Sequence, residues 1–339
     1  MRPVPVPLHI AVDVMSGDHG PAVFVPAALA AAREHPDVRF TLVGRTEERG
    51  RDFARLVPAN LAWLHAADVV TMADHPRDAL RHKKDSSMRR ALDLVKAREA
   101  GACVSAGNTG ALMATAHFVL KMLPGVERPA IASWIPSRGG HTFMLDLGAN
   151  ATATPGQLCQ FAVMGSVLAA DQGAAHAAPR VGLLNIGEED IKGDEVVQGA
   201  HNLLVAGDLN YVGFVEGHDI FGDAVDVVVT DGFTGNVALK TMEGAARLIA
   251  EAMREEFTRN PARKLGALIA APALSALRSR LDPRRYNGAS MVGLNGVVIK
   301  SHGGADAFAF QRAIEVAILE ARSGVPARIA ERLGSLPVP

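Results

Sequence analysis

The sequence is poor in the features that mark several large classes of protein. Aromatic residues make up only 5% of its 339 residues, and the formal net charge is −1 at pH 7. Nucleic-acid binders rely on aromatic stacking and basic fields, so this composition argues against a nucleic-acid partner. No run of the sequence approaches the roughly 20 apolar residues that a membrane-spanning helix needs. Any contact with a charged surface must therefore come from local clusters.

Cysteine is also scarce. Apolar residues flank both Cys103 and Cys159, and their spacing matches no metal-binding pattern. So little cysteine is typical of a reducing compartment. A thioester reaction could pass through the Cys103 thiol, but a buried free cysteine is the commoner role. Residues 1–5 show no apolar core of a signal peptide, so we expect a cytoplasmic protein.

Strand-like and helix-like segments alternate along the chain, which is long enough for a large core. Pro21 suits a first helical position, and Ser86 suits an N-cap. Strands are predicted at residues 8–13, 38–44, 102–105, 142–147, 180–186, 211–215, 225–230 and 296–300, and helices at residues 21–33, 86–100, 155–172, 194–206, 235–257 and 305–322. The alternation predicts a three-layer α/β/α fold with a mostly parallel sheet. We expect one catalytic unit over residues 1–339, with two closely packed lobes as an alternative.

Two loops rich in glycine and asparagine each follow a buried strand and open a helix. They are residues 105–110 (SAGNTG) and residues 231–236 (DGFTGN). Glycine lets the backbone approach a ligand, and a helix start offers free N–H groups at the positive end of a dipole. The pair predicts binding of an anion, most naturally phosphate, although such turns also occur without a ligand in α/β folds. The phosphate-binding candidates are Gly107, Asn108, Thr109, Gly110, Asp231, Gly232, Thr234 and Gly235.

Four more polar clusters follow predicted strands, at residues 13–20, 146–150, 185–193 and 300–304. Ligands of parallel sheets bind beyond the carboxyl ends of the strands, so we expect one shared pocket along one sheet edge. Asp13, Asn150 and Asn185 join the predicted substrate site. The catalytic candidates are Lys192, Lys300, His302 and Asn236.

The candidates differ in chemistry. Lysine would balance the charge of phosphate, whereas Asn108, Asn236 or His302 would donate to an oxyanion. His302 is either a general acid or a packed side chain. Asp13, Asp18 and Asp146 are possible ligands of a hard cation, but turn capping is their commoner role. No metal and no cofactor is predicted.

A basic-flanked apolar segment occupies residues 258–285. Seven basic residues and Asp282 surround an uncharged stretch, residues 265–277, that contains Pro272. Leu265, Leu268 and Ile269 share one helical face, and Leu274 and Leu277 share another after a break at the proline. The stretch is too short to span a bilayer. It suits a segment lying on anionic lipid, or a helical hairpin in a dimer.

A second basic cluster lies at residues 77–90. It contains Arg77, Arg81, Lys83, Lys84, Arg89 and Arg90, against Asp78 and Asp85. A charge run of this kind is usually a solvated face. The alternative is a surface that docks an acidic partner through charge complementarity.

Taken together, these motifs resemble the phosphate acyltransferases of bacterial phospholipid synthesis, the acyl-[acyl-carrier-protein]:phosphate transacylases. The resemblance covers residues 8–322. It rests on residues 10–13, 17–21, 105–113, 128–131, 146–150, 183–188, 192–193, 216–220, 226–241, 243–244 and 298–303. Ser16, where the family usually has glycine, and residues 290–292, in place of a proline-leucine run, depart from it.

The resemblance implies that inorganic phosphate attacks the thioester of a long-chain acyl-acyl carrier protein, giving acyl phosphate and free carrier protein. It also implies a fold similar to the isocitrate/isopropylmalate dehydrogenase group, a homodimer, and peripheral attachment to the inner face of the cell membrane. A membrane glycerol-3-phosphate acyltransferase would then use the acyl phosphate. The alternatives are a coenzyme A-dependent phosphotransacylase, a metal- and NAD-dependent hydroxyacid dehydrogenase of similar fold, and a non-enzymatic scaffold recruited to the membrane.

Overall fold

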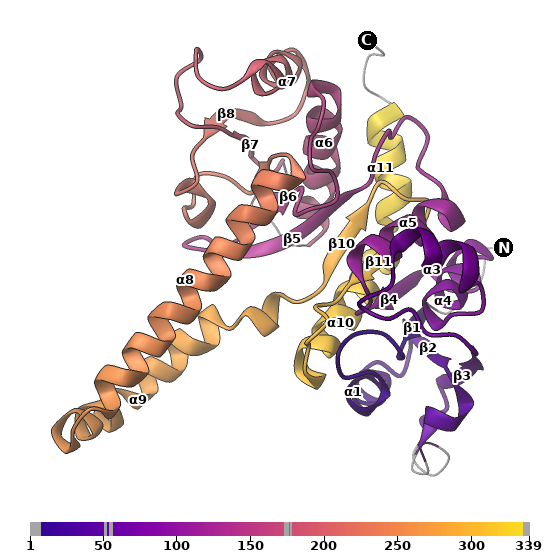
Figure 1. The fold of residues 1–339 in the computed structure, drawn as a ribbon. Helices are drawn as coiled ribbons and strands as arrows, with labels where there is room; N and C mark the ends of the chain where they lie inside the picture. The colour runs from indigo at the N-terminus through magenta and orange to yellow at the C-terminus, as the bar shows by residue number, and fades with distance from the viewer. Residues whose placement is uncertain (1–7, 51–52, 54–56, 173–175, 177, 335–339) are drawn as a thin grey trace.

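The computed structural model describes residues 8–50, 53, 57–172, 176 and 178–334 (Figure 1). Residues 1–5, where no signal peptide is expected, lie outside this range. The described strands form one mixed sheet in the order β3-β2-β1-β4-β11-β10-β5-β6-β9-β7-β8. Their bounds are β1 His9–Asp13, β2 Arg39–Gly44, β3 Leu61–His65, β4 Ala102–Ser105, β5 Ala130–Ser137, β6 Gly140–Leu145, β7 Val181–Leu184, β8 Tyr211–Val215, β9 Val227–Val229, β10 Ala289–Val292 and β11 Val297–Lys300.

Helices cover both faces of this sheet. Their bounds are α1 Pro21–Glu34, α3 Pro76–His82, α4 Ser87–Lys96, α5 Thr109–Leu120, α6 Pro155–Asp171, α7 Glu195–Ala206, α8 Gly232–Thr258, α9 Pro261–Leu281, α10 Ala307–Ser323 and α11 Val325–Gly334, with short 3₁₀ turns η1 Thr46–Arg49, η2 Asp219–Phe221 and η3 Pro283–Tyr286. The three-layer α/β/α expectation is confirmed. So are two predicted helix starts: Pro21 opens α1, and the Ser86 side chain accepts a hydrogen bond of 3.3 Å from the Arg89 N–H.

Strand direction divides the sheet into two parallel groups. One group contains β3, β2, β1, β4 and β11, and the other contains β6, β9, β7 and β8. Three antiparallel pairings, β11 with β10, β10 with β5 and β5 with β6, join the groups. Three reversals make the two groups run in opposite directions. Their carboxyl ends therefore lie at opposite edges of the sheet.

Alternation along the strands builds the core on both faces. In β1, Ile10 and Val12 pack on the face covered by α1 and α10, whereas Ala11 packs on the face covered by α4 and α5. The rings of Phe24 and Phe310 stack at a centroid distance of 4.1 Å and tie α1 to α10. In the second group, α6, α7 and α11 pack on a core of their own.

Helices α8 and α9 form a long hairpin that projects from the body of the molecule (Figure 1). This confirms the predicted protrusion. The expected break at Pro272 is wrong, because α9 continues through it. Proline removes one helical hydrogen bond, but α9 packs along α8, which supports both halves of the helix.

The apolar side chains of the hairpin are mostly exposed. No residue of α9 is buried; Leu265, Leu268 and Ile269 are 60%, 72% and 77% exposed, and Leu277 is 45% exposed. Leu274 is half-buried. Within the described residues, no helix has the length and apolarity to cross a bilayer.

Candidate active site

The first polar cluster lies beyond the carboxyl ends of β1, β4 and β11. We call it the β4 site and define it as residues 13–20, 105–110 and 300–306. Its three loops are bonded to one another. The Ser301 N–H donates to the Ser105 carbonyl at 2.9 Å, and the Asp18 N–H donates to the Gly303 carbonyl at 2.9 Å. The loops therefore form one continuous rim.

A buried carboxyl lies at the base of this site. Asp13 is fully buried, and the Ser105 hydroxyl donates to its Oδ2 at 2.6 Å. The Ser16 and Ser105 hydroxyl oxygens lie 3.2 Å apart. Burial raises the pKa of Asp13, while the serine hydroxyls act in the opposite direction by bonding the charged form.

Lys300 is the cation of the β4 site. Its Nζ donates to the Ala106 carbonyl at 3.4 Å and also to the Ser301 carbonyl. Burial lowers the pKa of Lys300 to about 8, against the opposing effect of the negative charges of Asp18 and Asp13. Its ammonium can therefore lose a proton near neutral pH.

The start of α5 supplies open donors to the same site. Asn108 caps the helix, because its Oδ1 accepts from the Ala111 N–H at 3.0 Å. Within the described residues, the N–H groups of Thr109 and Gly110 have no hydrogen-bond partner. A Cβ at Gly107 would lie 2.4 Å from Cε of Met88, so a larger residue there would require the Met88 side chain to shift. Free donors and a positive dipole end next to Lys300 are features that favour an anion.

His302 lies on the outer side of the rim and is exposed. Its Nδ1 accepts from the Gly304 N–H at 3.1 Å, which assigns the proton of the neutral ring to Nε2. His302 is therefore not packed in the core, and its Nε2–H is available as a donor.

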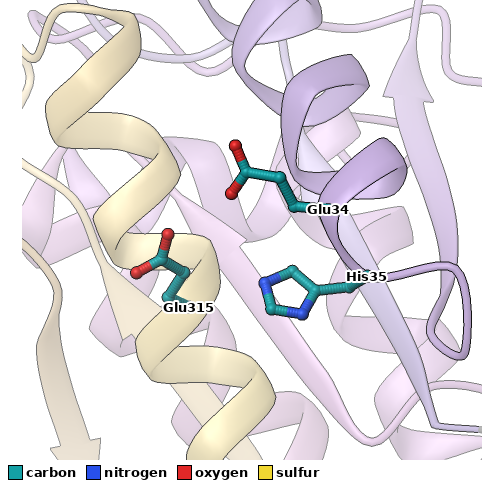
Figure 2. A group of neighbouring side chains, drawn as sticks. All are labelled: Glu34, His35 and Glu315. Atoms are coloured by element: carbon teal, nitrogen blue, oxygen red, sulfur yellow. The ribbon is translucent and has the colours of Figure 1, made fainter.

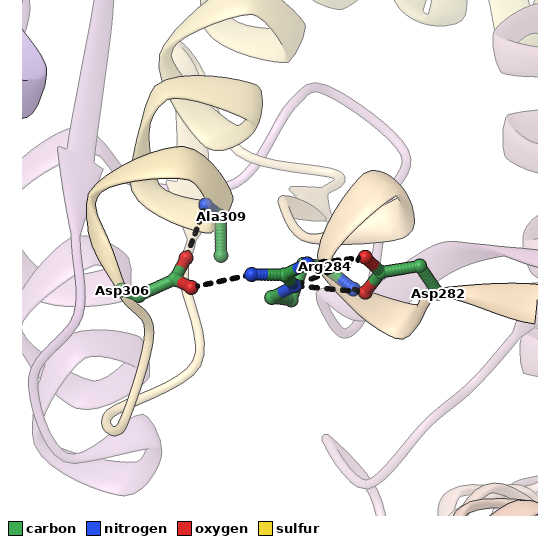
Figure 3. Close-up of polar contacts among 4 residues, drawn as sticks. All are labelled: Asp282, Arg284, Asp306 and Ala309. Carbon is green, nitrogen blue, oxygen red and sulfur yellow. Dashed lines mark hydrogen bonds and ion pairs between the residues drawn. The ribbon is translucent and has the colours of Figure 1, made fainter. Parts of the chain in front are cut away.

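The segment that returns from the hairpin braces this loop. Asn287 Nδ2 donates to the Ser301 hydroxyl at 2.8 Å, and Asn287 Oδ1 accepts from the His302 N–H at 2.9 Å. Figure 3 shows Arg284 between two carboxylates, donating through Nη1 to Asp306 at 2.8 Å and through Nε to Asp282 at 2.9 Å. Sequence reasoning missed Asn287, which no motif singles out.

The second polar cluster lies at the carboxyl ends of β6, β9 and β7. We call it the β9 site and define it as residues 146–150, 185–193 and 230–236. The Asp146 carboxylate accepts from the N–H groups of Ile131 at 3.0 Å, Ala149 at 2.9 Å and Asn150 at 2.8 Å. The Asn150 side chain donates to Asp146 at 2.9 Å and to the Pro129 carbonyl at 2.8 Å. Both polar side chains are thus engaged in holding the turn.

The glycines of the β9 site allow helix α8 to pack closely against the turn at residues 146–150. A Cβ at Gly235 would lie 1.9 Å from the Asp146 carbonyl oxygen, and one at Gly232 would lie 2.6 Å from the Asn150 carbonyl oxygen. Gly232, Thr234, Gly235 and Asn236 belong to the first turn of α8. The expectation of a loop over residues 231–236 is therefore wrong, because α8 starts directly after its cap.

The cap of α8 carries a negative charge. Asp231 accepts from the Thr234 N–H at 2.9 Å and from the Thr234 hydroxyl at 2.7 Å. A carboxylate at a helix start already occupies the place that favours an anion. The neutral cap of α5, Asn108, leaves that place open. Of the two helix starts, α5 is the better anion site.

Comparisons with known proteins agree over nearly the whole chain. Residues 8–328 match a family model described as fatty acid synthesis protein. The phosphate acyltransferase of Alkalilimnicola ehrlichii is 58% identical over 337 residues, and that of Methylococcus capsulatus is 55% identical over 328 residues; each alignment covers 96% of both chains. The chain belongs to this family.

Membership confirms the predicted resemblance and the expectation of an acyltransferase. Among solved structures, a phosphotransacetylase from Streptococcus pyogenes gives a TM-score of 0.60 at 17% identity, over 93% of this chain and 94% of that one. The EutD phosphotransacetylase from Staphylococcus aureus gives 0.58 at 15% identity, with the same coverage. At such low identity these structures show the fold alone, and they confirm the α/β class.

The structure separates the predicted site residues of this family member into two groups. Asp13, Gly107, Asn108, Thr109, Gly110, Lys300 and His302 lie in the β4 site, and Asn150, Asn185, Lys192, Asp231, Gly232, Thr234, Gly235 and Asn236 lie in the β9 site. The expectation of one shared sheet edge is wrong, because β5 and β10 reverse the direction of the chain between the groups. No hydrogen bond or ion pair among the described residues joins the two sites. The catalytic roles of these residues stay predictions.

Two members of the β9 site are held locally. The Asn185 side chain donates to the Lys192 carbonyl at 3.1 Å, which closes the loop between β7 and α7 on itself. Lys192 is exposed, and its Nζ has no partner in the part of the chain that the structure describes. Asn236 is exposed as well.

Carboxylates and a histidine gather at one place outside both sites. Figure 2 shows Glu34, His35 and Glu315, whose side-chain ligand atoms lie within 4.8 Å of one another between the end of α1 and α10. Gln311 already donates to Glu34 at 2.6 Å, and Arg312 pairs with Glu315 at 2.7 Å. The hydrogen bond from Gln311 and the ion pair with Arg312 explain why the carboxylates gather here without the need for a metal ion. Among the described residues, Asp13, Asp18 and Asp146 form no such group.

Proposed function

We propose that this chain transfers a long-chain acyl group from an acylated acyl carrier protein to inorganic phosphate, as a first step of phospholipid synthesis. The name phosphate acyltransferase, carried by its close relatives, supports phosphate as the acceptor. The open start of α5 beside Lys300 is the observation that carries the proposal. It offers free N–H groups, a positive dipole end and a cation within one rim.

In the proposed reaction, phosphate needs positioning more than activation, because it is already an anion near pH 7. The N–H groups of Thr109 and Gly110 and the Nζ of Lys300 would hold it. A phosphate oxygen attacks the thioester carbonyl carbon, and a tetrahedral oxyanion forms. His302 Nε2–H and Asn108 Nδ2–H are the donors of the β4 site that suit this oxyanion.

Collapse of the oxyanion completes the transfer. The carbonyl re-forms, the carbon–sulfur bond breaks, and the electron pair leaves on sulfur. The ammonium of Lys300, with its pKa of about 8, donates a proton to the thiolate, and solvent then reprotonates the lysine. The products are acyl phosphate and the free thiol of the carrier protein.

The test measures release of free carrier protein from an acylated one by the purified chain, with and without phosphate. Mass spectrometry of the quenched reaction identifies the acyl phosphate. We expect release that saturates with phosphate. Release that does not depend on phosphate would overturn the proposal.

A coenzyme A-dependent phosphotransacylase is the second candidate, because phosphotransacetylases share the fold. A donor panel separates the two. Preference for acetyl-coenzyme A over a long-chain acyl-carrier protein would favour the second candidate.

The protruding hairpin supports a further part of the proposal. We infer that residues 258–285 serve a homodimer and peripheral contact with an anionic membrane, because the α9 side chains are exposed and apolar between basic flanks. The chain would act as one catalytic unit over residues 1–339 in the cytoplasm, at the inner face of the membrane. A membrane acyltransferase that uses acyl phosphate and glycerol 3-phosphate would take the product there.

A further inference from the structure

The basic run of residues 77–90 divides into two kinds of side chain. Lys83 pairs with Asp74 at 2.5 Å, Arg89 pairs with Asp93 at 3.0 Å, and Arg90 pairs with Asp85 at 2.7 Å. These three cations are neutralised within the chain.

The other three cations of the run, Arg77, Arg81 and Lys84, are exposed and have no ion-pair partner among the described residues. Arg77 and Arg81 lie one turn apart on α3, so they share one face of the helix. Lys84 follows the end of the same helix. Asp78, also exposed on α3, offsets one of these three charges. The surface therefore keeps a net positive charge on a protein whose net charge is −1.

The helix that carries this charge borders the β4 site. The Met72 carbonyl accepts from Asn108 Nδ2 at 2.8 Å. A Cβ at Gly303 would lie 3.2 Å from Cε of Met72, and one at Gly110 would lie 3.0 Å from Cγ of Pro76. The residues that lead into α3 thus line the rim next to the open start of α5. Arg77 is the next residue of the chain.

We propose that Arg77, Arg81 and Lys84 form the docking surface for the acidic carrier protein that brings the acyl thioester. The inference rests on the proposed function and adds the place where the partner binds. An acidic protein face complements uncompensated cations, whereas the paired cations Lys83, Arg89 and Arg90 have little left to offer. Docking beside the rim places the prosthetic arm of the partner next to the phosphate-binding donors of α5.

The test is steady-state kinetics of Arg77→Glu/Arg81→Glu with three substrates: acylated carrier protein, phosphate, and an acyl thioester of coenzyme A. Each exposed ion pair is weak by itself, but charge reversal at two positions replaces two attractions with two repulsions. We expect the KM for acylated carrier protein to rise about tenfold. The KM for phosphate and turnover of the small thioester should stay within about twofold of the wild type. The wild-type KM for carrier protein should also rise with ionic strength.

The matched control is Arg33→Glu/Arg39→Glu, which reverses two exposed arginines at α1 and β2 without touching α3. It should keep the wild-type KM for carrier protein. The docking inference is overturned if the KM for carrier protein rises equally in both double variants. It is also overturned if Arg77→Glu/Arg81→Glu keeps the wild-type KM for carrier protein. Loss of binding to anionic vesicles with an unchanged KM would assign the surface to lipid instead. The proposed function itself is tested by the wild type alone. If the wild type does not use acylated carrier protein at all, the proposed function is overturned, whatever the variants do.

Discussion

At the scale of single residues, Lys300 is the side chain on which the proposed chemistry depends most. Replacing it with alanine removes both the cation that holds phosphate and the proposed proton donor. We expect Lys300→Ala to lower kcat/KM for phosphate by about 10²- to 10³-fold, the usual loss when one preorganised electrostatic group is removed. Phosphate-dependent release of carrier protein measures this. Unchanged turnover and phosphate dependence in a folded variant would show that Lys300 has no such role.

The same residue predicts a pH dependence. The pKa of Lys300 is lowered to about 8, so its ammonium is lost as the pH rises through 8. If the ammonium donates the proton to the leaving thiolate, kcat should fall on the alkaline side of about pH 8. In Lys300→Arg the guanidinium stays charged, so that alkaline limb should be absent. A wild-type kcat that is flat from pH 7 to 9 would contradict the prediction.

Glu320 is a buried residue outside both sites. We expect its ionisation to change the stability of the folded protein with pH. Its Oε1 accepts from Gln172 Nε2 at 2.9 Å and from the Ser290 hydroxyl. Burial raises the pKa of Glu320 from 4.5 to about 7. The unfolded chain ionises this group near pH 4.5, whereas the folded chain ionises it near pH 7. Folding therefore takes up a proton in this window, and stability falls as the pH rises through it.

Glu320→Gln should flatten this part of the pH dependence. The glutamine can accept the same two hydrogen bonds and cannot ionise. We expect its Tm to exceed that of the wild type at pH 8 and the difference to shrink toward pH 5. Glu331→Gln, an exposed carboxyl in α11, is the control and should follow the wild type at every pH. Parallel Tm curves for the wild type and Glu320→Gln would refute the assignment.

At the scale of elements, the contact of α8 with the turn after β6 explains two glycines, Gly232 and Gly235, for which the sequence pattern predicts an anion-binding role. A Cβ at Gly235 would lie 1.9 Å from the Asp146 carbonyl oxygen. This oxygen belongs to the backbone, so relieving the clash would require a shift of the main chain. We expect Gly235→Ala to destabilise the protein by about 1–3 kcal/mol through overpacking. Urea unfolding measures the change.

Gly244 gives a control in the same helix. A Cβ there meets nothing within 4 Å, so Gly244→Ala should stabilise α8 by roughly 0.5–1 kcal/mol. Equal free energies of unfolding for the two alanine variants would show that Gly235 does not seat the helix on Asp146.

The hairpin is the second element whose role can be tested by itself. Leu268 and Ile269 are 72% and 77% exposed on α9. This helix belongs to the hairpin that projects away from the body of the molecule (Figure 1). We expect Leu268→Glu/Ile269→Glu to lose flotation with vesicles that contain anionic phospholipid, because burying carboxylates in the interface is costly. Turnover in solution should remain. Sedimentation velocity in the same buffer reports whether these side chains instead join two copies.

At the scale of the whole molecule, sequence patterns predicted local structure better than assembly. Apolar runs, Pro21 and the Ser86 cap located most strands and helices within a few residues. They did not predict β3, β5 or β10. All pairings of β5 and β10 are antiparallel, whereas β3 pairs in parallel with β2. The order and direction of strands in a sheet depend on tertiary pairing and not on the local sequence. The sequence patterns therefore could not predict that the two parallel groups run in opposite directions. For the same reason the motifs of the β4 site and the β9 site were assigned to one edge. Pro272 failed as a breaker because support from α8 is a tertiary effect.

The connection between the hairpin and the β4 site is the property of the whole molecule that no single element shows. Arg284 joins Asp282 at the end of α9 to Asp306 at the start of α10 (Figure 3). Asn287 holds the loop of Ser301 and His302. Weakening these contacts should loosen the loop that follows Lys300 at the end of β11. We therefore expect Arg284→Ala to raise the KM for phosphate a few-fold and to speed hydrogen exchange over residues 300–306, with partial recovery in Arg284→Lys.

Arg285 supplies the matched control for this brace. It is the next residue, it is exposed, and it has no ion pair among the described residues, so Arg285→Ala should leave both quantities at wild-type values. If the two alanine variants behave alike, the carboxylate pairs of Arg284 do not hold the loop. If only Arg284→Ala responds, the ion pair of Arg284 with Asp306 couples the base of the hairpin to the phosphate-binding rim, and an event at the hairpin can alter phosphate binding through that contact.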